Sequence, residues 1–470
     1  MTYKDEQNKL FNTFLDEFYI DSWRENYRGE FNKDGDIILT NIELNIRGKC
    51  NLNCKYCYMQ RYMDTLYPAS IDNIGVSLDN VDKVFDWLRV EKLLPKGIDL
   101  FGGEAISCSE YQRLFNSIYS FVSELTEKQR ADFSVCLPAN VIFLEDKAYY
   151  DMLIDTQKRF IDIGIPIHYS LSLDGKYCDP HSRPAYNPKF RYSDSFYDTV
   201  IQFSRECALR PHFHPMIARE NIKYWKENFL WYVDFIRKAY QCSIQDSLKY
   251  LYLLEVRNWD WTDDEIKEFS LFLEFLIEYL YEQLGSDSFY KEVIKGTTLN
   301  ILHFYGMNRR GLTCGLQTNL TIRTGDLTTA PCHRLFYDIY TSSTIEVQPD
   351  KSFKFKSKNP YGHIMSCATN YRNIVPCSTC EINTLCNGPC LGSNYEANKD
   401  MFVVPEVVCK LEKAKIFTIM AKLKEKGLLP KVIADLKREG LRNSDYSYFM
   451  NHKYRQVNFI NFVEEESGRK

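Results

Sequence analysis

The alternation of apolar and polar positions divides the chain into segments with different expected structures. Between residues 37 and 300, short apolar runs of strand length alternate with longer segments in which apolar residues recur at helical spacing. Leu78 and Phe85, for example, fall on one face of a helix expected at residues 76–90. This repeat predicts an α/β fold with a parallel sheet built from six βα units. The expected strands are residues 38–46, 97–102, 133–139, 166–173, 211–217 and 249–256.

The pattern differs on both sides of this region. Residues 1–36 are polar with scattered aromatic side chains, and we expect an N-terminal extension that packs on the sheet. The last helix of the βα region is expected at residues 263–284. Short β segments and loops follow in residues 301–412, which predict a second domain, and residues 413–470 are expected to form C-terminal helices and a loose tail.

Composition and charge exclude several classes of function. The chain has 470 residues, of which 44% are hydrophobic and 26% charged, as in ordinary globular proteins. With a net charge of −4, the chain lacks the excess of basic residues that is typical of a nucleic-acid-binding protein. The most apolar stretch, residues 269–280, contains Glu274 and Glu278, so no membrane role is expected. Sixteen cysteines in a long chain without an apolar signal region predict a reducing compartment, the cytoplasm.

Three of these cysteines form a short loop directly after the first expected strand. Cys50, Cys54 and Cys57 are spaced by four and three residues. Iron–sulfur clusters usually take four Cys thiolates, so a loop with three leaves one iron free for a ligand that is not protein. Zinc sites usually have four protein donors, and no fourth Cys or His lies near this loop in the sequence. A [4Fe-4S] cluster with a reactive iron is therefore the favoured interpretation, and zinc or inert thiols are the alternatives.

With Tyr56 before the last cysteine, the loop resembles the radical S-adenosylmethionine (AdoMet) signature Cys-x3-Cys-x-aromatic-Cys. The resemblance implies that AdoMet binds the free iron and that the expected sheet is a partial (β/α)6 TIM barrel. At the end of the second expected strand, Gly102-Gly103-Glu104 is similar to the family's Gly-Gly-Glu-Pro motif, with Ala105 in place of Pro. In that family the motif binds the AdoMet amino group. A carboxylate is a suitable acceptor for an ammonium, and glycine permits close backbone approach.

A third segment of the same kind ends the fourth expected strand. Ser172-Leu-Asp174-Gly175 resembles the Ser-x-Asp-Gly segment common in peptide-modifying members of the family. Ser172 and Asp174 alternate to the same side of the strand, where they are expected to meet AdoMet. A strand end followed by an ordinary Asp-Gly turn explains the segment equally well.

The C-terminal cysteines carry a second resemblance. Their spacing is similar to that of the SPASM domain of radical AdoMet peptide maturases, although the loop between Gly325 and the following cysteine is longer here. A zinc ribbon is the alternative interpretation of the same spacing. The cysteines are Cys314, Cys332, Cys377, Cys380, Cys386, Cys390 and Cys409.

The SPASM resemblance implies two auxiliary [4Fe-4S] clusters, which makes three clusters in total. The implied ligands are Cys377, Cys380, Cys386 and Cys409 for the distal cluster, and Cys314, Cys332 and Cys390 for the cluster nearer the barrel. An eighth ligand is missing, because the position where some members have it is Asn308. The nearer cluster is therefore expected to have an open iron, a ligand such as Cys367, or a substrate thiolate.

Together these resemblances imply a radical AdoMet enzyme that modifies a ribosomally made precursor peptide. The group it resembles most joins a Cys sulfur to a carbon of another residue, with a reductant such as flavodoxin or ferredoxin. A carbon–carbon crosslinking or epimerising maturase remains an alternative. So does an anaerobic sulfatase-maturing enzyme, although those carry Asp where this chain has His333. An iron–sulfur or zinc protein without catalysis is the alternative from a different class.

Overall fold

The computed structural model describes a large part of the chain. The described residues are 41–90, 93–296, 319–338, 341, 343–350, 352–355, 377, 380, 390–401, 403–432 and 434–435. The expected N-terminal extension and tail, as well as Cys314, Asn308, Cys367 and Cys386, lie outside these residues.

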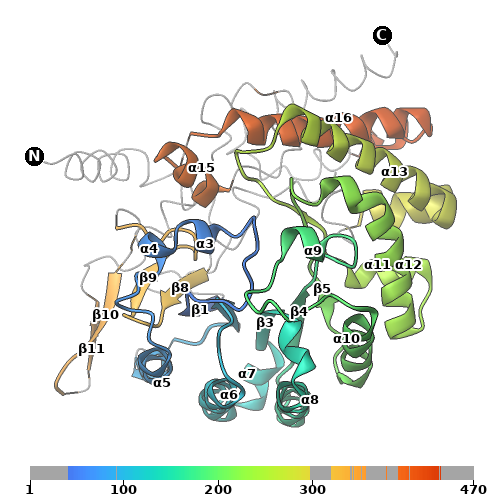
Figure 1. Ribbon diagram of the computed structural model, residues 1–470. Coiled ribbons are helices and arrows are strands. Elements are labelled where there is room, and N and C mark those ends of the chain that lie inside the picture. Colours follow the sequence, from blue (N-terminus) through green and yellow to red (C-terminus); the bar gives the residue numbers. More distant parts are fainter. Residues whose placement is uncertain are drawn as a thin grey trace, which may run out of the picture.

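A mixed sheet with a parallel centre organises the protein (Figure 1). Its strand order is β11-β10-β9-β8-β1-β2-β3-β4-β5, and β1 to β5 are parallel neighbours in the order of the sequence. This confirms the expected α/β fold. The strands of the first half are β1 (Asn41–Arg47), β2 (Gly97–Gly102), β3 (Ser134–Asn140), β4 (Ile167–Ser172), β5 (His212–Phe213), β6 (Met216–Ile217) and β7 (Leu254–Glu255).

The longer helices between these strands lie along the outer side of the sheet (Figure 1). They are α5 (Ile74–Val90), α6 (Cys108–Ser123), α8 (Lys147–Asp162), α10 (Asp194–Glu206), α11 (Trp225–Tyr240) and α13 (Asp263–Ser288). The short ones are α3 (Tyr58–Arg61), α4 (Met63–Leu66), α7 (Glu127–Ala131), α9 (Asp179–Ser182) and α12 (Ile244–Ser247). Of these, α3, α4 and α9 lie on the other side of the sheet (Figure 1). The 3-10 turns are η1 (Ile142–Glu145), η2 (Ile222–Tyr224) and η3 (Leu248–Tyr250), and a π turn, η4 (Phe289–Ile294), follows α13.

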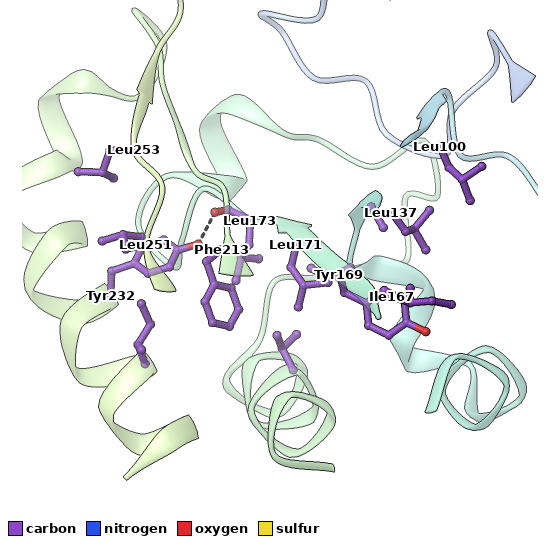
Figure 2. Packing of buried hydrophobic residues seen from close by; sticks show 14 of the residues in the cluster. Leu100, Leu137, Ile167, Tyr169, Leu171, Leu173, Phe213, Tyr232, Leu251 and Leu253 are labelled. Atoms are coloured by element: carbon purple, nitrogen blue, oxygen red, sulfur yellow. Dashed lines mark hydrogen bonds between the residues drawn. The ribbon is translucent and has the colours of Figure 1, made fainter. Parts of the chain in front are cut away.

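Alternate residues of the central strands form the core between the sheet and its helices. Leu137 of β3, Tyr169 and Leu171 of β4 and Phe213 of β5 pack together in Figure 2 and are at most 3% exposed. Because strand side chains alternate between faces, the residues between them face the interior of the curved sheet. That interior is the side on which the ends of β1 to β4 present the predicted site residues.

The fifth expected strand, residues 211–217, is interrupted in the structure. β5 pairs with β4, whereas β6 pairs with β7 in a separate ladder. Pro215 lies between β5 and β6 and has no N–H to donate, which explains the break. The sixth expected strand is correspondingly short, with only β7 and an isolated bridge between Phe213 and Leu251.

The C-terminal part continues the same sheet. Strand β8 (Asn319–Arg323) lies parallel to β1, and β9 (Thr328–Ala330), β10 (Ser343–Val347) and β11 (Phe353–Phe355) follow as antiparallel neighbours. The described residues of this part also include the helices α15 (Leu391–Asn398) and α16 (Glu406–Glu425). The expected domain boundary at residue 300 remains a prediction, and the sheet's hydrogen bonds run across it.

Helix α16 packs along α13 (Figure 1). Lys422 of α16 and Lys426, directly after that helix, both form ion pairs with Glu278 of α13. Within the described part of the chain, no helix has the length and apolar character needed to cross a bilayer.

Candidate active site

The loop with the three predicted cluster cysteines connects β1 to α3. The backbone N–H of Cys57 donates to the carbonyl of Cys54 at 3.0 Å, which closes a turn and places Cys57 at the start of α3. Cys50, Cys54 and Cys57 are all half-buried. The structure thus brings the three thiols together in one short loop, as the sequence predicts.

Burial raises the pKa of each of the three thiols, and their mutual repulsion adds to the effect at Cys54. The charge of one thiolate affects the pKa of the others, so the three sulfur atoms lie close together. This arrangement fits a group that binds all three as thiolates. Metal binding would displace their protons. Among the described residues, no set of three or more Cys, His, Asp or Glu converges on a single ion. Ligands that each bind a different iron of a cubane have no such common point.

A distant segment fixes the backbone of the cysteine loop. The N–H of Asn53 donates to the carbonyl of Pro184 at 2.8 Å, and the N–H of Lys55 donates to the carbonyl of Ser182 at 2.9 Å. Residues 51–55 and 182–186 therefore form a short antiparallel ladder, with a bridge between Leu52 and Ala185. The sequence alone does not reveal this support, because a pairing between backbone atoms leaves no mark in residue type or spacing.

Gly102 and Gly103 support the loop from the other side. The N–H of Gly103 donates to the carbonyl of Arg47 at 2.6 Å. A Cβ added to Gly103 would lie 2.1 Å from the carbonyl oxygen of Lys49 and 2.3 Å from that of Gly48. The backbone approach expected of these glycines is therefore made to the cysteine loop itself. Their expected contact with AdoMet remains a prediction.

Glu104, the next residue, holds a carboxylate in the interior. Its Oε2 accepts the backbone N–H of Asn140 at 2.5 Å, and its Oε1 forms no hydrogen bond of good geometry among the described residues. The hydroxyl of Tyr111 lies near the carboxylate and acts to lower its pKa. Burial raises the pKa of Glu104 to about 8. A buried carboxylate oxygen without a partner is a ready acceptor, and the ammonium of AdoMet fits this requirement.

Asn140, at the end of β3, connects Glu104 to the cysteine loop and was not predicted as a site residue. Besides its backbone bond to Glu104, its Nδ2 donates to Oδ1 of Asn51 at 2.6 Å and lies 3.8 Å from Sγ of Cys50. The expected strand ended one residue earlier, at 139. The rule that polar residues at the carboxyl ends of parallel strands gather at one site would have found it.

Asp174 is fully buried, and its carboxylate accepts hydrogen bonds from four protein donors. The hydroxyl of Tyr56 donates to its carboxylate at 3.1 Å, Ser182 Oγ at 2.5 Å, the N–H of Met216 at 2.9 Å and Asn221 Nδ2 at 3.3 Å. These donors leave it no free lone pair toward a ligand. In this structure Asp174 holds Tyr56 in the cysteine loop, and its expected contact with AdoMet remains a prediction.

Ser172 is placed differently from Asp174. It is the last residue of β4, half-buried, and lies opposite Asn140 of β3 in the register of the sheet. Its position beside Asn140 puts it at the same strand ends as Glu104. The AdoMet contact remains a prediction for Ser172.

Five of the seven predicted auxiliary-cluster cysteines fall in the described residues. Cys409 of α16 has its pKa raised by burial and by nearby Cys380, so two cysteines of the predicted distal set are neighbours. Cys332 and Cys390 of the predicted nearer set lie around Arg334, whose N–H approaches Sγ of Cys332 at 3.4 Å and whose charge interacts with Cys390. Cys377 packs in the same apolar cluster as Cys332. Cluster binding by these cysteines remains a prediction.

His333 lies at the wall of the site, held by a partner that the sequence did not reveal. Its Nδ1 lies 2.8 Å from Oε1 of Glu43 on β1, and its ring stacks on Phe101 with centroids 3.9 Å apart. Tyr58, directly after Cys57, is 5.5 Å away. Burial and then the Glu43 carboxylate raise the pKa of neighbouring Asp99 to about 6. An acidic, aromatic wall thus faces the cysteine loop.

Replacing Glu104 with Gln tests its predicted contact with AdoMet. A charge-assisted hydrogen bond contributes about 1.5 to 3 kcal/mol, so the variant should bind AdoMet more weakly by about one to two decades. Equilibrium binding to the reconstituted protein would measure this, with iron content as the check on the clusters. Glu124→Gln, which changes an exposed carboxylate, is the matched control. Equal affinity in a folded, iron-loaded Glu104→Gln variant would contradict the assignment.

Comparisons with known proteins identify the fold. No family model matches the sequence, and no curated protein does either. A structure described as native anSMEcpe with bound AdoMet, an anaerobic sulfatase-maturating enzyme, superposes with a TM-score of 0.53 at 13% identity, covering 82% of this chain and 98% of that one. The complex with AdoMet and the Kp18Cys peptide gives 0.51 at 13% identity, covering 82% and 97%. This chain therefore shares the fold of the AdoMet-bound protein over nearly the whole length of that protein.

Proposed function

We propose that this chain is a radical AdoMet enzyme that forms thioether crosslinks in a ribosomally made peptide. The observation that carries the proposal is the juxtaposition of the three-cysteine loop with Glu104. The loop is fixed from two sides by backbone hydrogen bonds, and an unpartnered buried oxygen of Glu104 lies beside it. The fold shared with AdoMet-bound structures supports the same interpretation.

The residues have distinct parts in this proposal. Cys50, Cys54 and Cys57 would hold the cluster, Glu104 would bind the AdoMet ammonium, and Ser172 would contact the rest of AdoMet. When bound, the cluster and AdoMet supply a 5'-deoxyadenosyl radical that abstracts hydrogen from an unactivated carbon. The interior of the sheet orients the peptide and excludes water at that carbon.

The remaining cofactors and partners belong to the same proposal. The auxiliary clusters would be held by the C-terminal cysteines, of which Cys332 and Cys390 lie around Arg334 and Cys380 lies near Cys409. A solved structure with the same fold contains a peptide, which supports a peptide as the substrate here. Electrons would come from a small reductant such as flavodoxin or ferredoxin.

Thioether formation has a balanced outcome. One hydrogen leaves the target carbon as an atom and ends in 5'-deoxyadenosine, the thiol releases a proton, and the surplus electron leaves to an iron–sulfur cluster. The new bond joins the Cys sulfur to the carbon. The peptide therefore becomes two hydrogens lighter, and one of its Cys residues can no longer be alkylated.

Mass spectrometry of the Cys-containing precursor peptide encoded beside the gene, after coexpression, tests the proposal. We expect the mass loss of two hydrogens, a protected Cys and accumulation of 5'-deoxyadenosine. A Cys→Ser peptide is the matched control and should remain unmodified, because a hydroxyl is a poorer nucleophile and metal ligand than a thiolate. An unmodified wild-type peptide together with unreacted AdoMet would contradict the proposal.

Sulfatase-type maturation is a second candidate, and the shared fold with anSMEcpe is the observation that favours it. His333 stands where those enzymes have Asp, and here its ring is bound by Glu43 and stacked on Phe101. The same mass spectrum separates the two. A product aldehyde that reacts with hydrazine would establish this second function, and a product of unchanged mass with an inverted alpha carbon would indicate an epimerase.

A further inference from the structure

Arg183 lies directly opposite the second cysteine of the loop. The ladder between residues 51–55 and 182–186 has hydrogen bonds from Asn53 to Pro184 and from Lys55 to Ser182. This register sets Cys54 opposite Arg183 as a pair that is not itself hydrogen-bonded, the arrangement in which antiparallel side chains are closest. The guanidinium is therefore positioned by the same backbone contacts that position the loop.

The guanidinium is buried and firmly held. Arg183 is 4% exposed, its Nη1 donates to the hydroxyl of Tyr56 at 3.0 Å, and its Nε lies 3.5 Å from Oδ1 of Asp179. Tyr192 holds its backbone carbonyl with a hydrogen bond of 2.7 Å. Because Tyr56 lies between Cys54 and Cys57, this contact attaches the cation to the cysteine loop twice, once through the ladder and once through a side chain.

Arg183 interacts electrostatically with the thiols of the cysteine loop and with two buried carboxylates. Its positive charge favours the thiolates of Cys54 and Cys57 and opposes the rise in their pKa that burial causes. Asp174 and Asp179 are the buried carboxylates beside it, and burial raises the pKa of both, that of Asp179 to about 7. A buried guanidinium is costly unless it is compensated. Asp179 compensates part of this charge, and an anionic group bound at the loop would interact favourably with the same guanidinium.

We propose that Arg183 is a positioning residue that sets the reduction potential of the iron–sulfur cluster held by Cys50, Cys54 and Cys57. The inference rests on the proposed function. It concerns the step in which the cluster is reduced before AdoMet is cleaved. A fixed positive charge stabilises the reduced cluster, which carries one more negative charge, over the oxidised cluster. Arg183 would thereby make the cluster easier to reduce.

Redox titration followed by electron paramagnetic resonance tests this in the reconstituted full chain. The signal of the loop cluster is identified as the one that changes when AdoMet is added. At a fixed potential, Arg183→Gln should lower the ratio of reduced to oxidised cluster by about tenfold, which is about 59 mV for a one-electron couple. Arg183→Lys keeps the charge and should keep most of the wild-type ratio.

Two further variants separate charge from structure. At a pH above the value of about 7 to which burial raises the pKa of Asp179, Asp179→Asn removes a negative charge beside Arg183 and should shift the ratio in the opposite direction, toward reduced cluster. Tyr56→Phe removes a hydrogen-bond partner of Arg183 but no charge, and its ratio should stay near that of the wild type. A purely structural role would lower iron content in Arg183→Gln and leave the potential of the remaining clusters unchanged.

The outcomes distinguish this inference from the proposed function. A wild-type protein with no AdoMet-sensitive cluster signal would overturn both. An AdoMet-sensitive signal with equal potentials in wild type, Arg183→Gln and Asp179→Asn would overturn the role of Arg183 alone. If Arg183→Gln takes up no cluster, an unshifted potential in Asp179→Asn would by itself overturn the role of Arg183.

Discussion

Simultaneous replacement of Cys50, Cys54 and Cys57 with Ala is expected to remove about four irons from a reconstituted total of about twelve, since each [4Fe-4S] cluster contributes four. AdoMet cleavage should fall to the background without enzyme, because the free iron that would bind AdoMet is lost. Iron and sulfide analysis of the purified protein, together with an assay for 5'-deoxyadenosine, measures both effects.

The structure indicates that this variant will fold. The loop is held by backbone hydrogen bonds to residues 182–186 and to Gly103, and none of these bonds involves a thiol. Replacement of three half-buried cysteines elsewhere, Cys108, Cys136 and Cys242, is the matched control and should leave iron content and turnover unchanged. Zinc in place of iron in the wild type, or full iron content in the triple variant, would contradict the cluster assignment.

The sequence predicted the fold where local pattern determines it. Alternating apolar residues located β1 to β4 within a few residues, and helical spacing located α5 and α13. The fifth strand was predicted as one element because its apolar pattern continues through Pro215, although the missing N–H breaks the ladder there. The parallel pairing of β8 with β1 was not predictable, because neither strand's pattern specifies a partner almost 280 positions away in the chain.

The candidate site divides in the same way. The cysteine loop and Glu104 were found because each is a short motif with its own chemistry. Asn140, Glu43 and Arg183 were missed, since their importance comes from contacts with residues far away in the sequence. The Gly102-Gly103 pair was predicted to approach AdoMet, which stays a prediction, and its close backbone contact in the structure is with the cysteine loop.

Asp174 shows why a strand-end carboxylate cannot be assigned from its position alone. Its alternation with Ser172 predicted one shared face and one shared ligand, but its side chain turns into a network of four protein donors. The alternative expectation of a structural turn is consistent with this network, and the AdoMet contact of Asp174 stays a prediction. Its connection to Tyr56 and, through Arg183, to the cysteine loop nevertheless makes it part of the site.

The largest expected effect on stability comes from a buried ion network that joins α16 to the end of β7. Nζ of Lys415 lies 2.6 Å from Glu255 and 2.9 Å from Glu412, and Arg257 contacts the same two carboxylates at 3.1 and 2.6 Å. Lys415, Glu255 and Glu412 are at most 7% exposed. Two cations and two carboxylates balance each other, so removing one leaves a buried charge without compensation.

Lys415→Met is therefore expected to lower the free energy of unfolding by about 3 to 5 kcal/mol, measured by denaturant unfolding at neutral pH. Adding Glu255→Gln to this variant should restore part of the loss, because the stranded carboxylate is then neutral. Lys410 is also on α16 and forms exposed ion pairs with Asp263 of α13 and with Glu406. Lys410→Met is therefore the control and should cost less than about 1 kcal/mol. Equal losses at Lys415 and Lys410 would show that the network contributes no more than a surface pair.

The same network predicts a dependence on pH and on cluster content. Burial acts to raise the pKa of Glu255, but Lys415 and Arg257 outweigh it and hold that pKa well below its usual range. A depressed carboxyl pKa stabilises the fold above the unfolded value of about 4.3 and ceases to do so as the pH falls through the folded value. Wild-type stability should therefore decline below about pH 4.3, with a shallower decline in Lys415→Met. Helix α16 also carries Cys409. Lys415→Met should therefore lose iron from the proposed distal cluster before it loses any from the cluster at Cys50. The reverse order would show that the ion network does not help to retain the distal cluster.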